Sequence, residues 1–312
     1  MRILLVRLDG VGDAAVCVPL IAALRDAGHE VGAALTTRNA GVYAPQVLIA
    51  EHVLERVPWP AHGSTPESTA RASAEIAAMR YDAALIASEE PEAFALAAGI
   101  PRRVGFTTSF ARPLKSLWVR ARTTRTVTRS QRIGGEAAHE CEVMYRLGDG
   151  LVREPAPPAE RVRLRPVLAS DGAESRARGG VVLQAGLKWL SAGVSREALR
   201  ALHDLLGGDA RVFAAPADAE FVREVAGVTP ETFPTLRAWV DALTTADRVI
   251  TVDTGAAHVA GMLAPRVIDV FPDRHFDAQV RRWRPWAASY RAFRASDVGA
   301  HGAFAEAVAD GV

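Results

Sequence analysis

Residues 248–262 read RVITVDTGAAHVAGM, and this stretch decides the fold that we expect. A run of β-branched and apolar residues ends at Asp253, and the small residues after Gly255 favour a helix. The pattern is typical of a parallel strand that leads directly into a helix. The first N–H groups of such a helix have no intrahelical acceptor, and the helix dipole adds positive charge there. The stretch therefore predicts a seat for an anion such as a diphosphate.

A structural interpretation of the same residues is equally open. Asp253 or Thr254 would then only cap the helix, and His258 would pack against the sheet. His258 is the fourth residue after Thr254 and lies one helical turn in, which suits contact with a phosphate and packing alike.

The composition is that of a soluble globular enzyme. The chain has 312 residues, 49% hydrophobic and 23% charged, with a formal net charge of +1. This length suits two domains. Two cysteines are too few for a disulfide framework or a metal knuckle, and no secretory leader pattern opens the sequence. We therefore expect a cytoplasmic protein. Its membrane contact is at most peripheral, to the inner face of the inner membrane, because no apolar run reaches the ~18 residues of a membrane span.

Apolar runs alternate with helical patterns in both halves of the chain. The runs at 2–8, 30–36 and 82–87 belong to the first half; the rhythm restarts at 181–185 and reaches its expected last strand at 267–271. Such alternation predicts two Rossmann-like, doubly wound α/β domains facing a central cleft, with ligands outside the carboxyl ends of the strands. The expected boundaries are 1–165 for the first domain, 166–180 for a linker, 181–290 for the second domain and 291–312 for a C-terminal helix.

The turn GVGDAA at residues 10–15 follows the first predicted strand and has two interpretations. It matches the G-x-G-x-x-A pattern of dinucleotide enzymes, and Arg38 at the end of the second strand could serve the 2′-phosphate of NADP. Asp13, however, would repel a pyrophosphate at the helix start. The other interpretation makes Asp13 an ionised base at the mouth of the cleft. Glu89 and Glu90, at a later strand end, are rival bases.

A basic segment covers residues 102–132, which contain nine arginines and lysines and no aspartate or glutamate. Within it, residues 110–122 predict an amphipathic helix. Its apolar side could pack on the sheet, or the segment could form a basic patch for an anionic acceptor or for the inner membrane. We do not expect nucleic-acid binding, since the charge is local and no aromatic stacking platform accompanies it.

Several motifs together resemble the heptosyltransferase family, glycosyltransferase family 9. They are RLDGVGD at 7–13, PLIAALR at 19–25, HE at 139–140, KW at 188–189 and DTGAAHVA at 253–260. The D-T-G-x-x-H element is the most specific of them. The resemblance covers nearly the whole chain and implies a GT-B architecture, in which the first domain binds the acceptor and the second a nucleotide sugar. It also implies inverting, metal-independent transfer from ADP-heptose to a glycan or lipid-linked acceptor of the lipopolysaccharide type.

The resemblance also implies roles for individual residues. Asp13 matches the proposed base, and Lys188 the lysine near the donor diphosphate. The predicted donor-binding residues are Gln184, Glu220, Asp253, Thr254, Gly255, Ala256 and His258. From the basic segment and the glycine turn, and not from the resemblance, we predict Gly12, Arg112, Lys115 and Arg120 as acceptor-binding residues. We expect no cofactor and no metal ion, because one base and one cationic group on opposite sides of the anomeric carbon are sufficient for this chemistry.

Two alternative functions stay open at this point. One is an NADP-dependent oxidoreductase that uses Gly10, Gly12 and Arg38. The other is a sugar-nucleotide-binding protein that has lost catalysis. The sequence leaves the acceptor, the donor sugar and nucleotide, and the oligomeric state undetermined.

Overall fold

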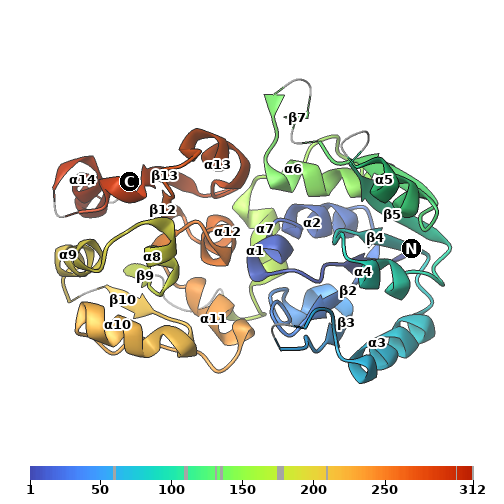
Figure 1. Cartoon of the computed structure of the whole chain (residues 1–312), viewed down its shortest axis with the longest axis horizontal. Coiled ribbons are helices and arrows are strands. Elements are labelled where there is room, and N and C mark those ends of the chain that lie inside the picture. The colour runs from blue at the N-terminus through green and yellow to red at the C-terminus, as the bar shows by residue number, and fades with distance from the viewer. Residues whose placement is uncertain are drawn as a thin grey trace. The chain divides into compact units, whose positions relative to one another are not determined.

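The computed structural model divides into two compact units, Met1–Pro158 (unit 1) and Ala159–Val312 (unit 2). It describes residues 1–58, 61–108, 112–130, 132–133, 136–173, 179–208, 210–299 and 301–310. Figure 1 shows that each unit is built from a sheet and helices. Within the described residues, no helix is both long and apolar enough to cross a membrane.

Unit 1 contains a six-stranded parallel sheet with the order β3-β2-β1-β4-β5-β6. Its strands are β1 (Arg2–Val6), β2 (Glu30–Thr36), β3 (Leu48–Leu54), β4 (Ala83–Ile86), β5 (Arg102–Thr107) and β6 (Arg125–Thr128). The central strands β1 and β4 are almost wholly buried, as expected for parallel strands covered by helices on both faces. Strands β3 and β6 form the two edges of the sheet. Their sequences are more polar than those of the central strands, so the sequence analysis did not predict them as strands.

The helices of unit 1 connect these strands. They are α1 (Val11–Ala15), α2 (Val18–Asp26), α3 (Pro66–Met79), α4 (Pro91–Leu96), α5 (Pro113–Arg120) and α6 (Glu140–Tyr145). A small hairpin of β7 (Arg132–Ile133) and β8 (Glu136–Ala137) precedes α6. Of the helix predicted over 110–122, residues 110 and 111 lie outside the described residues, and α5 covers 113–120.

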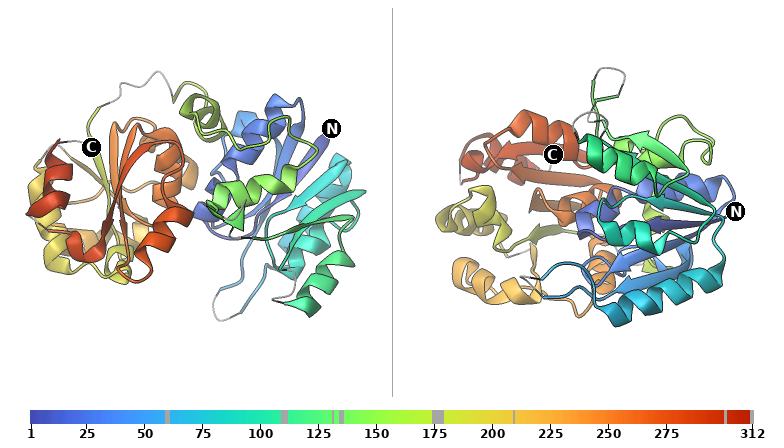
Figure 2. Two further views of the ribbon diagram at one scale, coloured as in Figure 1. Left: turned by 90° about the horizontal axis from the view of Figure 1, so that it is seen from above. Right: turned by 45° about the vertical axis from the view of Figure 1, so that its right-hand side comes forward.

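Unit 2 contains a five-stranded parallel sheet with the order β10-β9-β11-β12-β13. Its strands are β9 (Val181–Gln184), β10 (Arg211–Phe213), β11 (Arg248–Val252), β12 (Arg266–Phe271) and β13 (Ser289–Arg294). The helices are α7 (Arg161–Leu168), α8 (Lys188–Ala192), α9 (Arg196–Leu206), α10 (Ala219–Ala226), α11 (Leu236–Leu243), α12 (Gly255–Leu263), α13 (Phe276–Trp283) and α14 (Gly302–Asp310). The left view of Figure 2 shows helices on both faces of this sheet.

The division between the units falls earlier in the chain than the sequence predicts. Helix α7 belongs to unit 2, because Arg165 donates hydrogen bonds to the carbonyls of Leu263 (3.2 Å) and Thr244 (3.1 Å). The predicted linker at 166–180 therefore begins inside a helix of unit 2. Its residues 174–178 lie outside the described residues.

The C-terminal prediction needs a correction. Residues 267–271 are not the last strand, because 289–294 form β13 and pair in parallel with β12. The predicted helix over 291–312 is confined to α14, from 302 to 310, while Ala300, Gly311 and Val312 lie outside the described residues. The sequence SYRAFR concealed the strand, since it lies at the sheet edge and exposes alternate residues instead of forming an apolar run.

Each sheet has a topological switch point, which lies between two neighbouring strands. From one of these strands the chain continues toward one edge of the sheet, and from the other strand it continues toward the opposite edge. In unit 1 this point lies between β1 and β4, and in unit 2 between β9 and β11. Ligands of open α/β sheets bind outside the carboxyl ends of the strands at such points. The loops that follow these four strands are therefore the places to look for a site.

Candidate active-site residues

Asp13 lies just beyond the carboxyl end of β1, in the short helix α1. Its Oδ1 is 2.7 Å from Nη2 of the buried Arg7, and its Oδ2 accepts a hydrogen bond from the Gly10 N–H at 3.2 Å. The Asp13 side chain is still 39% exposed. The carboxylate is thus fixed in direction, paired with a cation and open to a ligand. Gly12, beside it on α1, is half-buried.

The same contacts weaken the dinucleotide interpretation of this turn. A pyrophosphate in a G-x-G-x-x-A turn needs the backbone N–H groups of the turn. Here the Gly10 N–H already donates to the Asp13 carboxylate, which would also repel a phosphate. The structure thus does not favour NADP at this site.

The rival bases Glu89 and Glu90 are both neutralised by cations. Glu89 is paired with Lys115 and, at 2.9 Å, with Arg129. Burial opposes ionisation of Glu89, but the hydrogen bond from Lys115 and the charge of Arg129 outweigh it and lower the pKa of the carboxyl. Both oxygens of Glu90 accept from Arg56, at 2.7 and 2.8 Å. Glu89 is less exposed than Asp13, at 30% against 39%, whereas Glu90 is 39% exposed and, like Asp13, is paired with an arginine.

The predicted acceptor residues of the basic segment do not form one group. Lys115 reaches Glu89 at the end of β4 and is committed to that ion pair. Arg112 and Arg120 are exposed at the two ends of α5, and neither has a salt-bridge partner among the described residues. Their role toward an acceptor stays a prediction.

Unit 1 also holds a cavity that the sequence analysis missed. It has a volume of about 520 Å³, and it is lined by Arg38, Arg56, Val57, Ala61, His62, Gly63, Glu90, Pro91 and Glu92. Arg56 is held by the two glutamates and by the Leu8 carbonyl, whereas Arg38 is exposed and unpaired among the described residues. The signal that could have found this cavity is the position of Arg38 and Arg56 just after β2 and β3. It was lost because β3 was not predicted.

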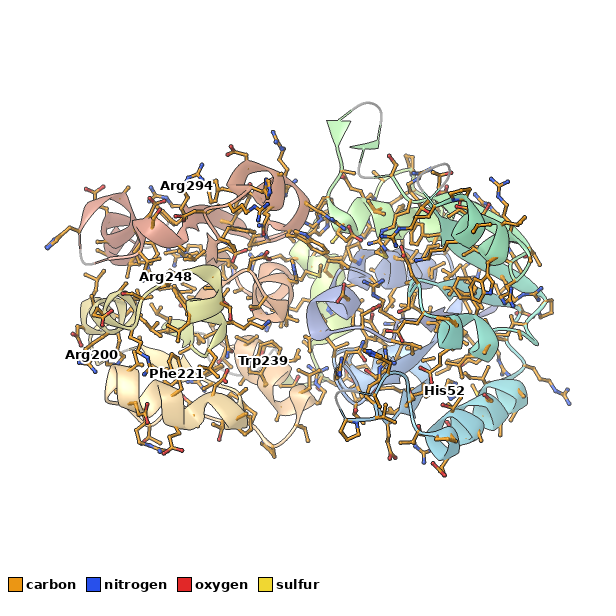
Figure 3. All side chains as sticks on the ribbon, viewed as in Figure 1. His52, Arg200, Phe221, Trp239, Arg248 and Arg294 are labelled. Atoms are coloured by element: carbon orange, nitrogen blue, oxygen red, sulfur yellow. The ribbon has the colours of Figure 1, made fainter. Side chains whose placement is uncertain are left out.

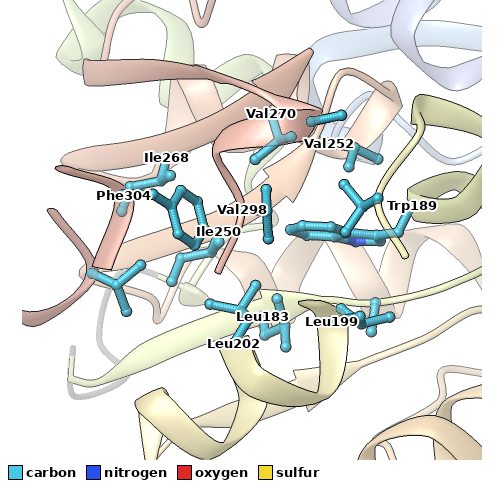
Figure 4. Packing of buried hydrophobic residues seen from close by; sticks show 14 of the residues in the cluster. Leu183, Trp189, Leu199, Leu202, Ile250, Val252, Ile268, Val270, Val298 and Phe304 are labelled. Atoms are coloured by element: carbon cyan, nitrogen blue, oxygen red, sulfur yellow. The ribbon is translucent and has the colours of Figure 1, made fainter. Parts of the chain in front are cut away.

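Lys188 begins α8, directly beyond the carboxyl end of β9. Its side chain is exposed and has no ion-pair partner among the residues that the structure describes. The next residue, Trp189, is 1% exposed and donates from Nε1 to the Gln184 carbonyl at 2.8 Å. Figure 4 shows Trp189 packed among core residues such as Val252. The tryptophan therefore anchors the loop and leaves the lysine in solvent.

The side chains of Gln184 and Glu220 differ in how free they are to contact a donor. The Gln184 amide accepts from Trp239 Nε1 at 2.8 Å and donates to the Phe213 carbonyl at 3.3 Å. Trp239 lies on α11 (Figure 3), so this amide links α11 to the sheet. Glu220 is exposed in the first turn of α10, after β10. Contact of either residue with a donor stays a prediction.

The turn at 253–258 is a strand-to-helix junction, as predicted. Thr254 is the N-cap of α12, and its hydroxyl accepts from the Ala256 N–H at 3.3 Å. The Ala257 N–H donates to the Thr254 carbonyl, which leaves the Gly255 N–H as the first-turn amide without an acceptor in the helix. Because β9 and β11 are neighbours, this amide and Lys188 follow adjacent strand ends.

His258 is packed inside unit 2. It is 6% exposed, its ring lies 5.5 Å from that of Trp283, and its Nε2 is 3.8 Å from Asp253 Oδ1. Burial raises the pKa of Asp253 to about 7. Near neutral pH, part of the Asp253 population is therefore uncharged and does not repel an anion at the turn.

Asp269 is a second buried acid that the sequence analysis missed. It lies on β12 opposite Thr251, is 0% exposed, and neither carboxyl oxygen has a hydrogen-bond partner. Burial first, and then the charge of Asp253, raise its pKa well above the usual value. The sequence does contain a signal for this buried acid, because Asp269 interrupts the apolar run VIDVF at 267–271. Among the described residues, this site included, no group of three or more histidine, cysteine, aspartate or glutamate side chains could hold a metal ion.

Comparison with known proteins finds similar structures but no similar sequence family. No model of a known protein family matches the chain, and no curated protein matches it in sequence. Solved structures match it over nearly its whole length.

Three of them illustrate the similarity. A family 9 glycosyl transferase from Veillonella parvula has a TM-score of 0.70 and 16% identity, covering 95% of this chain and 86% of that one. E. coli heptosyltransferase WaaC with ADP has a TM-score of 0.68 and 20% identity, covering 99% and 98%. E. coli ADP-heptose LPS heptosyltransferase II has 0.65 and 15%, covering 94% and 90%. The chain therefore has the fold of the family 9 glycosyltransferases, two Rossmann-like α/β units of the GT-B type.

Proposed function

We propose that this protein is an inverting, metal-independent glycosyltransferase. It moves heptose, or a related sugar, from an ADP-sugar to a hydroxyl group of an anionic glycan or glycolipid of the lipopolysaccharide type. One observation carries the proposal: each unit places its motif residues at its own switch point. Asp13 lies at the end of β1 in unit 1, and Lys188 and the Thr254–Gly255 turn lie at the ends of β9 and β11 in unit 2.

The donor half of the site belongs to unit 2. Lys188 offers an unpaired ammonium group, and the first turn of α12 offers the Gly255 N–H and the Thr254 hydroxyl. This set suits a diphosphate, because a helix N-terminus and a lysine both stabilise anionic oxygens. E. coli WaaC, which has the same fold, is known with ADP and with ADP-2-deoxy-2-fluoro heptose. We assign the corresponding donor class to this chain.

The acceptor half belongs to unit 1. We assign the base to Asp13, because it matches the base proposed for the family that the sequence resembles and lies at the end of β1, beside the switch point of unit 1. The cavity beside Arg56 opens at the same edge of the sheet, because Arg56 donates to the Leu8 carbonyl just before the Asp13 turn. Its exposed Arg38 suits an acceptor that carries a carboxylate or a phosphate.

The transfer then needs few groups. The acceptor hydroxyl attacks the anomeric carbon from the face opposite the diphosphate and gives its proton to the Asp13 carboxylate. As the new C–O bond forms, the bond to the diphosphate breaks, and Lys188 stabilises the charge on the leaving oxygens. Inversion follows, because a single displacement occurs.

The first test removes the base. The Asp13→Asn variant keeps the size of the side chain but cannot accept a proton, so we expect about a thousandfold loss of kcat with ADP affinity nearly unchanged. Transfer from ADP-heptose is followed by mass spectrometry over a panel of anionic glycan acceptors, and ADP binding by calorimetry. Asp26→Asn, an exposed acid on α2, is the matched control. Full activity of Asp13→Asn would remove Asp13 from the mechanism.

The second test removes the cation. For Lys188→Ala we expect kcat to fall by about a hundredfold or more, because the leaving diphosphate loses its ammonium partner. Arg196→Ala, which removes an exposed cation from the next helix, should keep wild-type kinetics. Unchanged kinetics of Lys188→Ala would refute the role of this lysine. Donor binding without turnover in the wild type, over the whole acceptor panel, would instead indicate a binding protein.

A further inference from the structure

Asp13 and Asp253 occupy corresponding positions in their units but have opposite electrostatic surroundings. Each lies beyond the carboxyl end of a strand beside a switch point, β1 in unit 1 and β11 in unit 2. Asp13 is paired at 2.7 Å with the buried guanidinium of Arg7, which is a permanent cation. Among the residues that the structure describes, the one ion-pair partner of Asp253 is His258, whose Nε2 lies 3.8 Å from Asp253 Oδ1. Because a histidine is a cation only when it is protonated, none of these residues gives Asp253 a permanent countercharge.

The sheet beneath Asp253 supplies a second acid and not a cation. The strand pairing continues to Asp253, whose N–H donates to the Val270 carbonyl at 2.9 Å. Figure 4 shows Val252 and Val270 in the core of unit 2. Residues alternate between the two faces of a strand, so Asp253 and Asp269 share the opposite face. Asp269 is buried on β12, next to β11, and neither of its carboxyl oxygens has a hydrogen-bond partner. An ionised Asp253 therefore has another acid on the neighbouring strand.

The elements that pack against β11, β12 and α12 carry further ionisable groups. These groups include Arg165 of α7, Lys188 of α8, Asp241 of α11, Arg282 of α13 and Arg294 of β13. Arg165 donates to two backbone carbonyls, and Asp241 is paired with an arginine of its own helix at 3.0 Å. Arg282 and Arg294 lie over aromatic rings, at 4.7 and 4.3 Å from the ring centroids, and Lys188 is exposed. None of the five is an ion-pair partner of Asp253 in the described part of the chain.

A diphosphate at this turn adds negative charge beside Asp253. The N–H group assigned to it belongs to Gly255, two residues after Asp253. The Asp253 side chain is 18% exposed, so its carboxyl reaches the surface of the turn. Burial already raises the pKa of Asp253 to about 7, and a neighbouring anion raises it further because like charges oppose ionisation. Binding of the anion and binding of a proton to Asp253 therefore favour each other.

We propose that donor binding in unit 2 is coupled to the uptake of a proton by Asp253, so that the affinity for the diphosphate falls as the pH rises. The inference rests on the proposed donor site and adds the regulation of that site. The bound protein holds more protons than the free protein. The complex is therefore favoured at low pH and weakened as the pH rises above about 7, where free Asp253 loses its proton.

The test measures the binding of ADP-ribose by calorimetry between about pH 6 and pH 9. Both phosphates of ADP-ribose are esterified, so this ligand, unlike ADP, takes up no proton itself in that range. We expect the Kd to rise about tenfold or more across the range, because a shift of one pKa unit corresponds to a tenfold change in Kd. Titrations near neutral pH in buffers of different ionisation enthalpy should show an uptake of roughly half a proton or more for each ligand bound.

The variant Asp253→Asn should remove the coupling. The amide does not titrate, so we expect a Kd that is nearly constant over the pH range and close to the wild-type value at its acid end. Asp277→Asn changes an exposed acid in the first turn of α13 and is the matched control. It should keep the wild-type pH dependence. Circular dichroism melting curves show whether each variant is folded.

The possible results separate this inference from the proposed function. A wild-type Kd that does not change with pH would leave the donor site in place and remove the coupling. Wild-type pH dependence in Asp253→Asn would mean that another group, such as His258, takes up the proton. Loss of binding by folded Asp253→Asn at every pH would mean that the donor needs the carboxylate itself. Each of these results would overturn the proposal. Absence of ADP-ribose binding by the wild type at any pH would contradict the donor assignment and the coupling together.

Discussion

At the scale of single residues, the most unusual feature is the buried acid Asp269. Neither of its oxygens accepts a hydrogen bond, and it lies on the strand next to Asp253. A carboxyl group without a partner is far more costly to bury when ionised than when neutral. Burial therefore favours the neutral form of the Asp269 carboxyl and raises its pKa well above the usual value.

This residue gives a prediction about stability and pH. The unfolded chain releases the Asp269 proton near pH 3.9, whereas the folded chain keeps it to a much higher pH because the folded pKa is raised. The folded state therefore binds more protons, and stability falls as pH rises from about 4 toward the folded pKa. Each pH unit in this window costs about 1.4 kcal/mol.

The measurement is the free energy of unfolding in urea between pH 5 and 8. Asp269→Asn should flatten the fall, by at most about 1.4 kcal/mol per pH unit below the folded pKa, since the amide does not titrate. The control Asp204→Asn changes an acid whose side chain is 72% exposed, and it should retain the wild-type slope. An unchanged slope in Asp269→Asn would show that this carboxyl does not titrate as described.

At the scale of elements, α12 packs so closely against the segment around Pro285 that a side chain at Gly261 does not fit. Gly261 lies in the interior of this helix, and its carbonyl accepts from the Ala287 N–H at 2.9 Å. A Cβ atom at Gly261 would lie 2.8 Å from Cα of Pro285, which is backbone and cannot rotate away. The glycine thus lets the segment after α13 lie against the helix that carries the Thr254–Gly255 turn.

The packing reverses the usual effect of an alanine. Glycine to alanine in a helix interior normally gains about 1 kcal/mol, but here we expect Gly261→Ala to lower the free energy of unfolding by roughly 1–3 kcal/mol. Thermal and urea unfolding measure this loss. Gly99→Ala, at a position with no atom within 4 Å of the added Cβ, is the control and should be close to neutral. A gain in stability for Gly261→Ala would mean that the 284–287 segment moves aside easily.

At the scale of the whole molecule, the two units have separate hydrophobic cores. One cluster contains Leu4, Val6 and Ile76 in unit 1, and another contains Leu183, Trp189 and Ile250 in unit 2. A ligand that binds only folded unit 2 stabilises that unit by mass action, by about 2.7 kcal/mol at a hundred times its Kd.

We therefore expect ADP to protect unit 2 selectively. In hydrogen exchange followed by mass spectrometry, saturating ADP should slow exchange in peptides that cover α8 and the β11–α12 turn, while peptides from unit 1 keep their rates. AMP, which lacks the diphosphate, should protect the turn less. Equal protection in both units, or protection centred on the Gly10–Asp13 turn, would contradict the assignment of the donor to unit 2.

The α/β class, the division into two units and the strand-to-helix junctions around Asp13 and Thr254 could all be predicted from the sequence. These features depend on local signals, namely apolar runs, small residues after a strand, and caps, which act over a few neighbouring residues. Three features became clear only from the three-dimensional structure: the side of α5 that faces the core, the position of β3 and β13 at the sheet edges, and the packing of α7 in unit 2.

The three-dimensional structure also decided which charges are available. Lys115, Glu89 and Glu90 looked as free as Lys188 in the sequence, but the first three are neutralised by partners that lie distant in the chain or on another element. Asp269 and His258 were equally undecided until packing buried them. The physical reason is the same in each case: burial and ion pairing are set by contacts between residues far apart in the chain, and periodicity carries no information about such contacts.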